Sequence, residues 1–194
     1  MGDEKRITPI QLYNTNAIRS FRLDLDVSAT ELSVGIKKGP TYIGHLESNA
    51  GDSYYSDDVM NRVADFLSKA AKEKQAYLKS QKSRKKIKTD YTVHDFYPKK
   101  QLPEAKVSRV IEPIPKGSGP TITLNAVLET SDFFDIPRRL SEIVAHCNQL
   151  QNQKWKGSDF TQTISRLVKK ERLQEVPVEG GFTAYVKPEE AKKD

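Results

Sequence analysis

The chain has 194 residues, of which 30% are charged and 36% belong to the hydrophobic set, and its formal net charge is +6. This length suits one ordinary domain or two small ones, and the composition is typical of a folded protein rather than a disordered one. No stretch of about 18 apolar residues is present, which argues against a membrane-spanning helix, and no apolar segment follows the charged first residues as in a secretory signal peptide. We therefore expect an intracellular protein of the cytoplasm or nucleus, with no membrane partner.

The positive charge is concentrated in the middle of the chain. Residues 1–78 carry 10 basic and 11 acidic side chains, residues 79–118 carry 11 and 4, and residues 119–194 carry 11 and 11. The densest run contains six basic residues and no acid: Lys79, Lys82, Arg84, Lys85, Lys86 and Lys88. Such a run attracts polyanions, and each phosphate that it neutralises releases counterions. We interpret it as a nucleic-acid-binding arm; a solvated linker and a nuclear-localisation signal are the alternatives.

The N-terminal part predicts a small sheet and a helix. Apolar and polar residues alternate over 20–27 and 32–37, which is typical of half-buried strands. A third strand is expected over 41–46, after the turn at Gly39 and Pro40. Ser56 is a good N-cap, because Asp57 and Asp58 follow it in a first helical turn. The expected fold class is therefore α+β, and residues 1–78 are expected to form an antiparallel β-meander covered by one helix.

The middle part, residues 79–118, is expected to be a basic, Pro-rich connecting segment. Prolines at close spacing argue against a long helix here, and the alternation allows short strands at 92–97 and 107–111. The stretch from Pro113 to Pro120 is the clearest domain boundary, since Pro and Gly together keep it extended.

The C-terminal part predicts three helices followed by a hairpin. A short helix lies around Leu124, a second opens near Asp135 or Ile136 with Pro137 in its first turn, and a third runs over 158–172. Two alternating segments, 175–178 and 182–187, flank a glycine pair that readily takes positive φ. Residues 119–188 resemble the winged helix-turn-helix superfamily, and residues 189–194 form a charged tail.

The resemblance implies where this domain would contact DNA. The outward face of the third helix would enter the major groove, basic residues before it would hold the backbone, and the glycine turn would be the tip of the wing. These residues are Thr161, Gln162, Ser165, Arg166, Lys169 and Lys170 on the helix, Arg138, Arg139, Lys154 and Lys156 before it, and Gly180 and Gly181 in the wing. Because the domain is neutral overall, we expect it to supply orientation, while the arm supplies most of the attraction.

The sequence thus favours a non-enzymatic accessory or regulatory protein, for example in transcription regulation, that binds nucleic acid, with DNA favoured over RNA. Winged helices also serve as protein-binding modules, so the alternative is an adaptor that binds a protein partner or forms a homodimer.

Residues for catalysis or metal binding are sparse. The three histidines lie far apart at no metal-ligand spacing, and no Gly-rich phosphate loop is present. We therefore expect no cofactor and no metal, and a buried, inert thiol at Cys147. A third hypothesis comes from Asp95, Glu104 and Lys106, which resemble in outline the acidic pair and lysine of metal-dependent nucleases.

Overall fold

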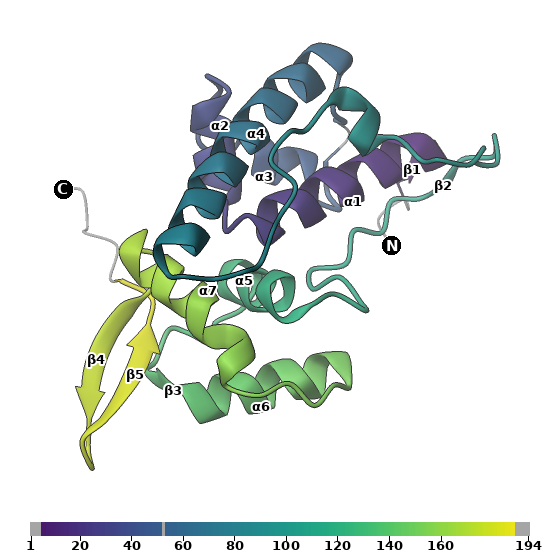
Figure 1. Ribbon diagram of the computed structural model, residues 1–194. Coiled ribbons are helices and arrows are strands. Elements are labelled where there is room, and N and C mark those ends of the chain that lie inside the picture. Colours follow the sequence, from purple (N-terminus) through teal and green to yellow (C-terminus); the bar gives the residue numbers. More distant parts are fainter. Residues whose placement is uncertain (1–4, 52, 189–194) are drawn as a thin grey trace. The chain divides into compact units, whose positions relative to one another are not determined.

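The computed structural model describes residues 5–51 and 53–188, and these fall into two compact units. Unit 1 ends at Ile111 and unit 2 begins at Glu112. The elements of unit 1 are β1 (Arg6–Ile7), α1 (Pro9–Asp24), α2 (Ala29–Gly35), α3 (Tyr42–Leu46), α4 (Asp57–Ser80), the 3-10 helix η1 (Val93–Phe96) and β2 (Val107–Ser108). Those of unit 2 are α5 (Pro120–Thr130), β3 (Arg138–Arg139), α6 (Leu140–Gln151), α7 (Ser158–Lys169), β4 (Gln174–Val178) and β5 (Phe182–Val186). Figure 1 labels the α-helices and the strands of both units. The tail over 189–194 lies outside the described residues.

Unit 1 is helical where the sequence predicted strands. The prediction of a β-meander over 20–27, 32–37 and 41–46 is wrong, since these segments lie in α1, α2, α3 and the turns between them. The alternation was misleading because Arg22, which a strand would have turned to solvent, is only 1% exposed. Two local signals specify helices instead: Thr8 forms a capping box with Gln11, and Ser28 forms one with Glu31.

The helix predicted after Ser56 is confirmed. The Ser56 hydroxyl accepts a hydrogen bond from the Val59 amide, and α4 then continues for 24 residues. Its buried face packs with α1, α2 and η1, and the cluster includes Leu32, Ile43 and Phe96. Figure 1 shows α1 and α3 behind α4 in this unit.

Most of the segment predicted as a connection, residues 79–111, belongs to unit 1. Tyr91 and Phe96 are buried in its core, and both rings contact Phe21 of α1. The strand expected over 92–97 is wrong: η1 forms there, because the Asp95 carboxylate accepts from the Thr92 amide in a capping arrangement. A short strand within 107–111 does form, as β2 pairs antiparallel with β1.

Unit 1 contains a buried ion cluster around Glu47, the residue that follows α3. Glu47 accepts from Arg22 through both carboxylate oxygens, with Nε to Oε1 at 2.8 Å, and Arg19 Nε lies 3.3 Å from its Oε2. The Tyr55 hydroxyl donates to the same carboxylate at 3.2 Å. Burial is the main cause that raises the pKa of Tyr55 well above its ordinary value, and the charge of Glu47 is the second. Buried groups bound in this way hold α1 to the chain that follows α3.

Unit 2 combines three helices with a three-stranded antiparallel sheet of order β3-β5-β4. The predicted hairpin is confirmed: β4 pairs with β5, and Gly180 and Gly181 take φ values of 85° and 75° in the turn. The second helix was predicted to open near Asp135 or Ile136, but α6 begins at Leu140. The residues before it, Arg138 and Arg139, form β3 and pair with β5 instead.

The core of unit 2 lies between α5, α6 and α7. It includes Leu124, Ile143, Phe160 and Leu167, and the half-buried Trp155 packs edge-on to Phe160 with ring centroids 5.8 Å apart. Cys147 is buried there, and burial raises the pKa of its thiol to about 12. The thiol is therefore a core group rather than a nucleophile.

Candidate nucleic-acid interface

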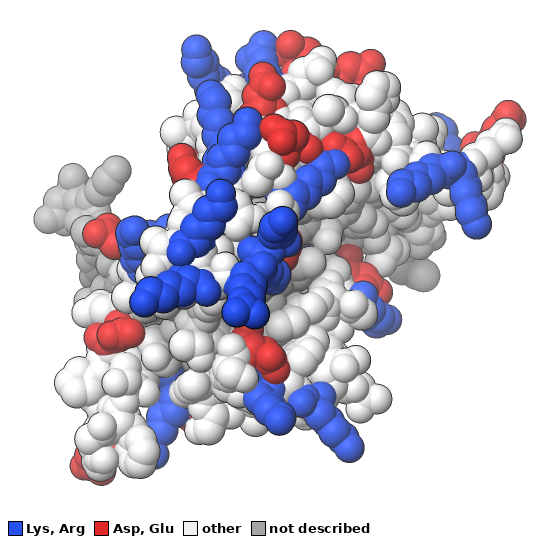
Figure 2. All heavy atoms as spheres, in the orientation of Figure 1, with Lys and Arg blue, Asp and Glu red and all other residues white. Residues whose placement is uncertain are grey.

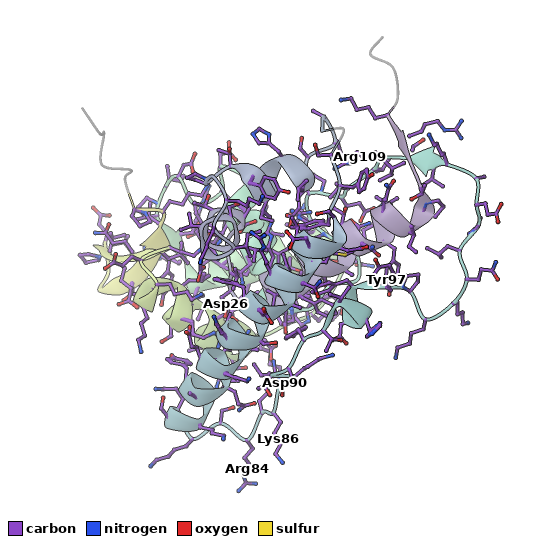
Figure 3. The ribbon with its side chains drawn as sticks, turned by 90° about the horizontal axis from the view of Figure 1, so that it is seen from above. Asp26, Arg84, Lys86, Asp90, Tyr97 and Arg109 are labelled. Carbon is purple, nitrogen blue, oxygen red and sulfur yellow. The ribbon has the colours of Figure 1, made fainter. Side chains whose placement is uncertain are left out.

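Five exposed basic side chains lie close together in the sequence, at the end of α4 and in the segment that follows it. We call this set the basic loop: Lys79, Lys82, Arg84, Lys85 and Lys86. In Figure 3, Arg84 and Lys86 point away from the ribbon at the end of α4. The sixth member of the run, Lys88, differs, because it pairs with Asp95 and lies over the Tyr91 ring at 5.2 Å from the centroid.

The basic loop begins with a tight helix cap. The Ser83 amide donates to the Leu78 carbonyl and the Lys82 amide to the Lys79 carbonyl, both at 2.9 Å, and Lys82 has a φ of 54°. This is a Schellman motif, in which the left-handed position is usually glycine. A side chain there costs about 1 kcal/mol, so the chain keeps a lysine where glycine would be more stable.

One neutral side chain holds the loop against α4. The Gln75 amide donates to the Lys85 carbonyl at 3.2 Å and accepts from the Ile87 amide at 2.8 Å. Ile87 itself packs on the core of unit 1, and the Ser83 hydroxyl accepts from the Lys85 amide at 3.2 Å. The predicted arm is therefore a tethered loop, with its backbone bound and its charged side chains outward.

The acids next to the loop are engaged by other cations. Asp90 pairs with Lys72 at 3.2 Å, and the hydrogen bond from Lys72 is the main cause that lowers the pKa of Asp90. At Asp95, desolvation raises the pKa, but the bonds from Lys88 and Thr92 outweigh it, and the net pKa is lowered. No basic-loop residue has an acidic partner in the described part of the chain. Figure 2 shows Lys and Arg side chains gathered over α4 and the chain that follows it.

Two predicted phosphate contacts in unit 2 have structural roles. Arg138 donates to the Phe133 carbonyl at 2.9 Å, lies over the Phe133 ring and pairs with Glu142 at 3.6 Å. Arg139 donates to the Glu179 carbonyl at 3.1 Å and lies over the Phe182 ring. Both are half-buried, so these guanidinium groups hold β3 to its surroundings.

Arg166, predicted as a base-reading residue on the outward face of α7, is buried. Its side chain is 7% exposed and donates to the Thr163 hydroxyl at 3.3 Å, which in turn bonds the Thr121 hydroxyl at 3.0 Å. The helical spacing was right, but Arg166 lies at the border of the face, where local partners decide its direction.

The other predicted residues of unit 2 are exposed. On α7, the Thr161 hydroxyl donates to the Gly157 carbonyl, and the Lys156 amide before the helix is bound by Asp159. The exposed set comprises Thr161, Gln162, Ser165, Lys169 and Lys170 on or just after α7, Lys154 and Lys156 before it, and Gly180 and Gly181 in the turn.

Unit 1 contains a compact helix pair that the sequence did not predict. A turn over 36–41 joins α2 to α3, and the two helices pack together. The buried Ser33 hydroxyl fixes them, since it donates to the Ala29 carbonyl at 2.7 Å and accepts from the Ile43 amide at 2.9 Å. Lys37 and Lys38 are exposed in the turn. The capping box at Ser28 and Glu31 was a sequence signal that could have found α2.

The nuclease-like residues are not assembled into a metal site. Asp95 is bound by Lys88 and Thr92, while Glu104 and Lys106 are exposed on the segment before β2. Within residues 5–51 and 53–188, no three His, Cys, Asp or Glu side chains gather to hold a metal ion. Of the helices that the structure describes, none is both long enough and apolar enough to cross a membrane.

The chain was compared with protein-family models, with curated proteins and with solved structures, and none of them matches it.

Proposed function

We propose that this protein binds duplex DNA as an accessory or regulatory factor, and that the basic loop supplies most of the attraction. The observation that carries the proposal is the basic loop itself: five exposed cations without acidic partners among the described residues, on a backbone that Gln75 holds in place. Held cations lose less conformational freedom on binding than those of a flexible tail.

The chemistry of the loop fits a polyanion. Four lysines and one arginine offer point charges and a guanidinium fork, which are the groups that proteins use on phosphates. Charges spread over successive residues match a chain of phosphates better than a single small anion. Each contact releases condensed counterions and strengthens binding at low salt.

The helix pair α2–α3 supports a duplex as the target. Two packed helices joined by the turn over 36–41 resemble in outline a helix-turn-helix, whose second helix lies in the major groove of DNA. The exposed residues Thr41 and His45 lie at α3, and Lys37 and Lys38 precede it. This support is one of layout, so the loop carries more weight.

We further propose that unit 2 is a winged helix-turn-helix that orients the DNA. Its element order, α5-β3-α6-α7-β4-β5, and its sheet order, β3-β5-β4, agree with that layout. Thr161 and Gln162 on α7 are exposed and chemically suited to base edges or phosphates. With Arg138, Arg139 and Arg166 engaged inside the unit, unit 2 would add specificity more than attraction.

The test is the salt dependence of binding to a duplex oligonucleotide. The triple variant Arg84→Gln, Lys85→Gln and Lys86→Gln should reduce the slope of log affinity against log salt by about 2.7, since each lost phosphate contact removes about 0.9. A triple variant in the exposed segment before β2, Lys99→Gln, Lys100→Gln and Lys106→Gln, removes equal charge and should leave most of the slope. Equal losses in the two variants, or no binding of the wild type at low salt, would refute the proposal.

A second candidate function for unit 2 is self-association. Ile136 and Phe182 are large, apolar and more than half exposed, at 55% and 56%. Apolar side chains of this kind are enriched at protein interfaces. Sedimentation equilibrium should then show that the wild-type chain is a dimer. The double variant Ile136→Ser and Phe182→Ser should be a monomer. A wild-type chain that is monomeric at all concentrations would eliminate this candidate.

A further inference from the structure

A second group of cations surrounds a groove between α2 and α4. The groove has a volume of about 450 Å³, and its charged lining includes Lys37 at the end of α2 with Arg62 and Lys69 on α4. Phe66 forms the contact between the two helices: a Cβ added to Gly35 would lie only 2.0 Å from the Phe66 ring. A side chain larger than glycine's at position 35 would therefore displace the Phe66 ring.

The cap of α2 presents Lys37 in the same way as the cap of α4 presents Lys82. The Lys38 amide donates to the Ser33 carbonyl and the Lys37 amide to the Val34 carbonyl, both at 2.9 Å, and Lys37 has a φ of 61°. Lys37 thus occupies the left-handed position of a Schellman motif, where glycine is usual. Both basic clusters of unit 1 thus contain a lysine in this unfavourable conformation, Lys37 in one and Lys82 in the other.

The conformation alone does not assign a role, because other helices end in the same way. Asp26 takes the left-handed position after α1 and pairs with the buried Lys74 at 3.3 Å, and Glu171 takes it after α7. Lys37 differs from Asp26 in being exposed, with no acidic partner among the described residues. It differs from Glu171 in facing a groove with two further cations.

The charge balance of the groove favours an anion. Its one acid is Asp65, while Arg62 pairs with Asp58 at 2.9 Å on a largely exposed stretch of α4. Exposed ion pairs of this kind are worth little, so a phosphate can take the Arg62 guanidinium from Asp58. Lys37 and Lys69 have no acidic partner in the part of the chain that the structure describes.

The groove and the basic loop each include residues of α4. Lys69 and Lys79 are ten residues apart on α4, which corresponds to about 15 Å along the helix axis. Figure 2 shows Lys and Arg side chains along α4 as well as behind its end. Duplex DNA carries one phosphate charge per about 1.7 Å of its axis, so one duplex offers phosphates over the whole of this distance.

We propose that the groove between α2 and α4 is a second phosphate-binding site, formed by Lys37, Arg62 and Lys69, for the same duplex that the basic loop contacts. This inference rests on the proposed function, since it assigns a second contact to the same DNA. Two sites on the same duplex fix the direction of its backbone along α4, which a single site does not.

The test uses the full-length chain, a duplex oligonucleotide and two variants, Lys37→Gly and Lys69→Gln. Each should reduce the salt slope by about 0.9 and weaken binding about eightfold at 0.1 M salt, the affinity that one phosphate contact contributes. Lys37→Gly should also keep or raise the thermal midpoint, because glycine relieves the left-handed cap. A variant that is at least as stable yet binds more weakly separates a ligand contact from a structural one.

Two matched controls complete the design. Glu171→Gly relieves the same kind of cap without removing a cation, so it should raise the midpoint and not weaken DNA binding. Lys99→Gln removes an exposed cation that lines a different groove, so it should change the slope by much less than 0.9. If the wild type binds duplex DNA but Lys37→Gly and Lys69→Gln bind as it does, this inference fails and the proposed function stands. If the wild type does not bind at low salt, both fail.

Discussion

The basic residues of the two units are used differently. In unit 1, the basic loop presents five cations to solvent on a backbone that the neutral Gln75 side chain holds. In unit 2, Arg138 and Arg139 bind backbone carbonyls and aromatic rings, and Arg166 is buried against Thr163. A count of charges along the chain cannot separate these uses. What separates them is whether the structure already provides a partner for each charge.

The same difference appears between guanidinium and ammonium groups. The arginines of unit 2 have planar donors that satisfy several acceptors at once, which suits a structural role. The lysines of the basic loop are compact and strongly hydrated, and four of the five loop cations are lysines. A surface rich in unpaired lysine is therefore more available to an external polyanion than an equal number of engaged arginines.

The largest expected effect concerns the buried charges of the two units. Glu47→Ala would leave Arg22 buried without its carboxylate and should lower the free energy of unfolding by about 3–5 kcal/mol. The comparable change in unit 2 is Glu129→Ala, which removes one partner of the partly exposed Arg172. Asn125 would still accept a hydrogen bond from Arg172. Glu129→Ala should cost about 1 kcal/mol. Urea denaturation followed by circular dichroism measures both, and equal losses would contradict the contrast.

The second effect tests whether the basic loop depends on its tether. Gln75→Ala removes both bonds to the loop without changing any charge. Affinity for duplex DNA should fall about tenfold, since ordering even one or two released residues costs about 1–2 kcal/mol each. The salt slope should stay the same. Gln101→Ala, at an exposed position in another segment, is the control, and a lower slope in Gln75→Ala would mean that the tether acts in another way.

The third effect tests the structural role of the unit 2 arginines. The double variant Arg138→Gln and Arg139→Gln should lower the free energy of unfolding by about 1–2 kcal/mol, because it removes two cation–π contacts and two bonds to carbonyls. The DNA salt slope should change by less than the 0.9 expected for one phosphate contact. If the slope instead falls by about 1.8 with no loss of stability, these residues bind phosphate as the sequence suggested.

The smallest effect concerns the Cys147 thiol. With its pKa raised to about 12 by burial, only about one molecule in ten thousand carries the thiolate at pH 8, whereas an exposed thiol is ionised to roughly a quarter. Labelling by a thiol reagent at pH 8 should therefore be slow until unit 2 opens. The labelling rate then reports the stability of unit 2 separately from that of unit 1. Rapid labelling of the folded chain would contradict the buried thiol.

The sequence by itself determined the features that rest on neighbouring residues. Ser56 with two acids after it specified the start of α4, the Gly180–Gly181 pair specified the turn between β4 and β5, and the count of charges located the basic run. Each of these depends on interactions within a few residues, so local chemistry was sufficient.

The tertiary structure decided which charged residues are free and which are bound. The alternation through Arg22 suggested a strand because its partner, Glu47, lies 25 residues away. The sequence placed Lys88 in the basic run, but in the fold Lys88 pairs with Asp95. Gln75 carried no sequence signal because it binds residues 10 and 12 positions later in the chain. The energy of burying or holding a charge depends on the group that meets it in space. For that reason the sequence located the positive charge. Only the fold distinguished the basic loop, whose cations are exposed, from the arginines that are bound within unit 2.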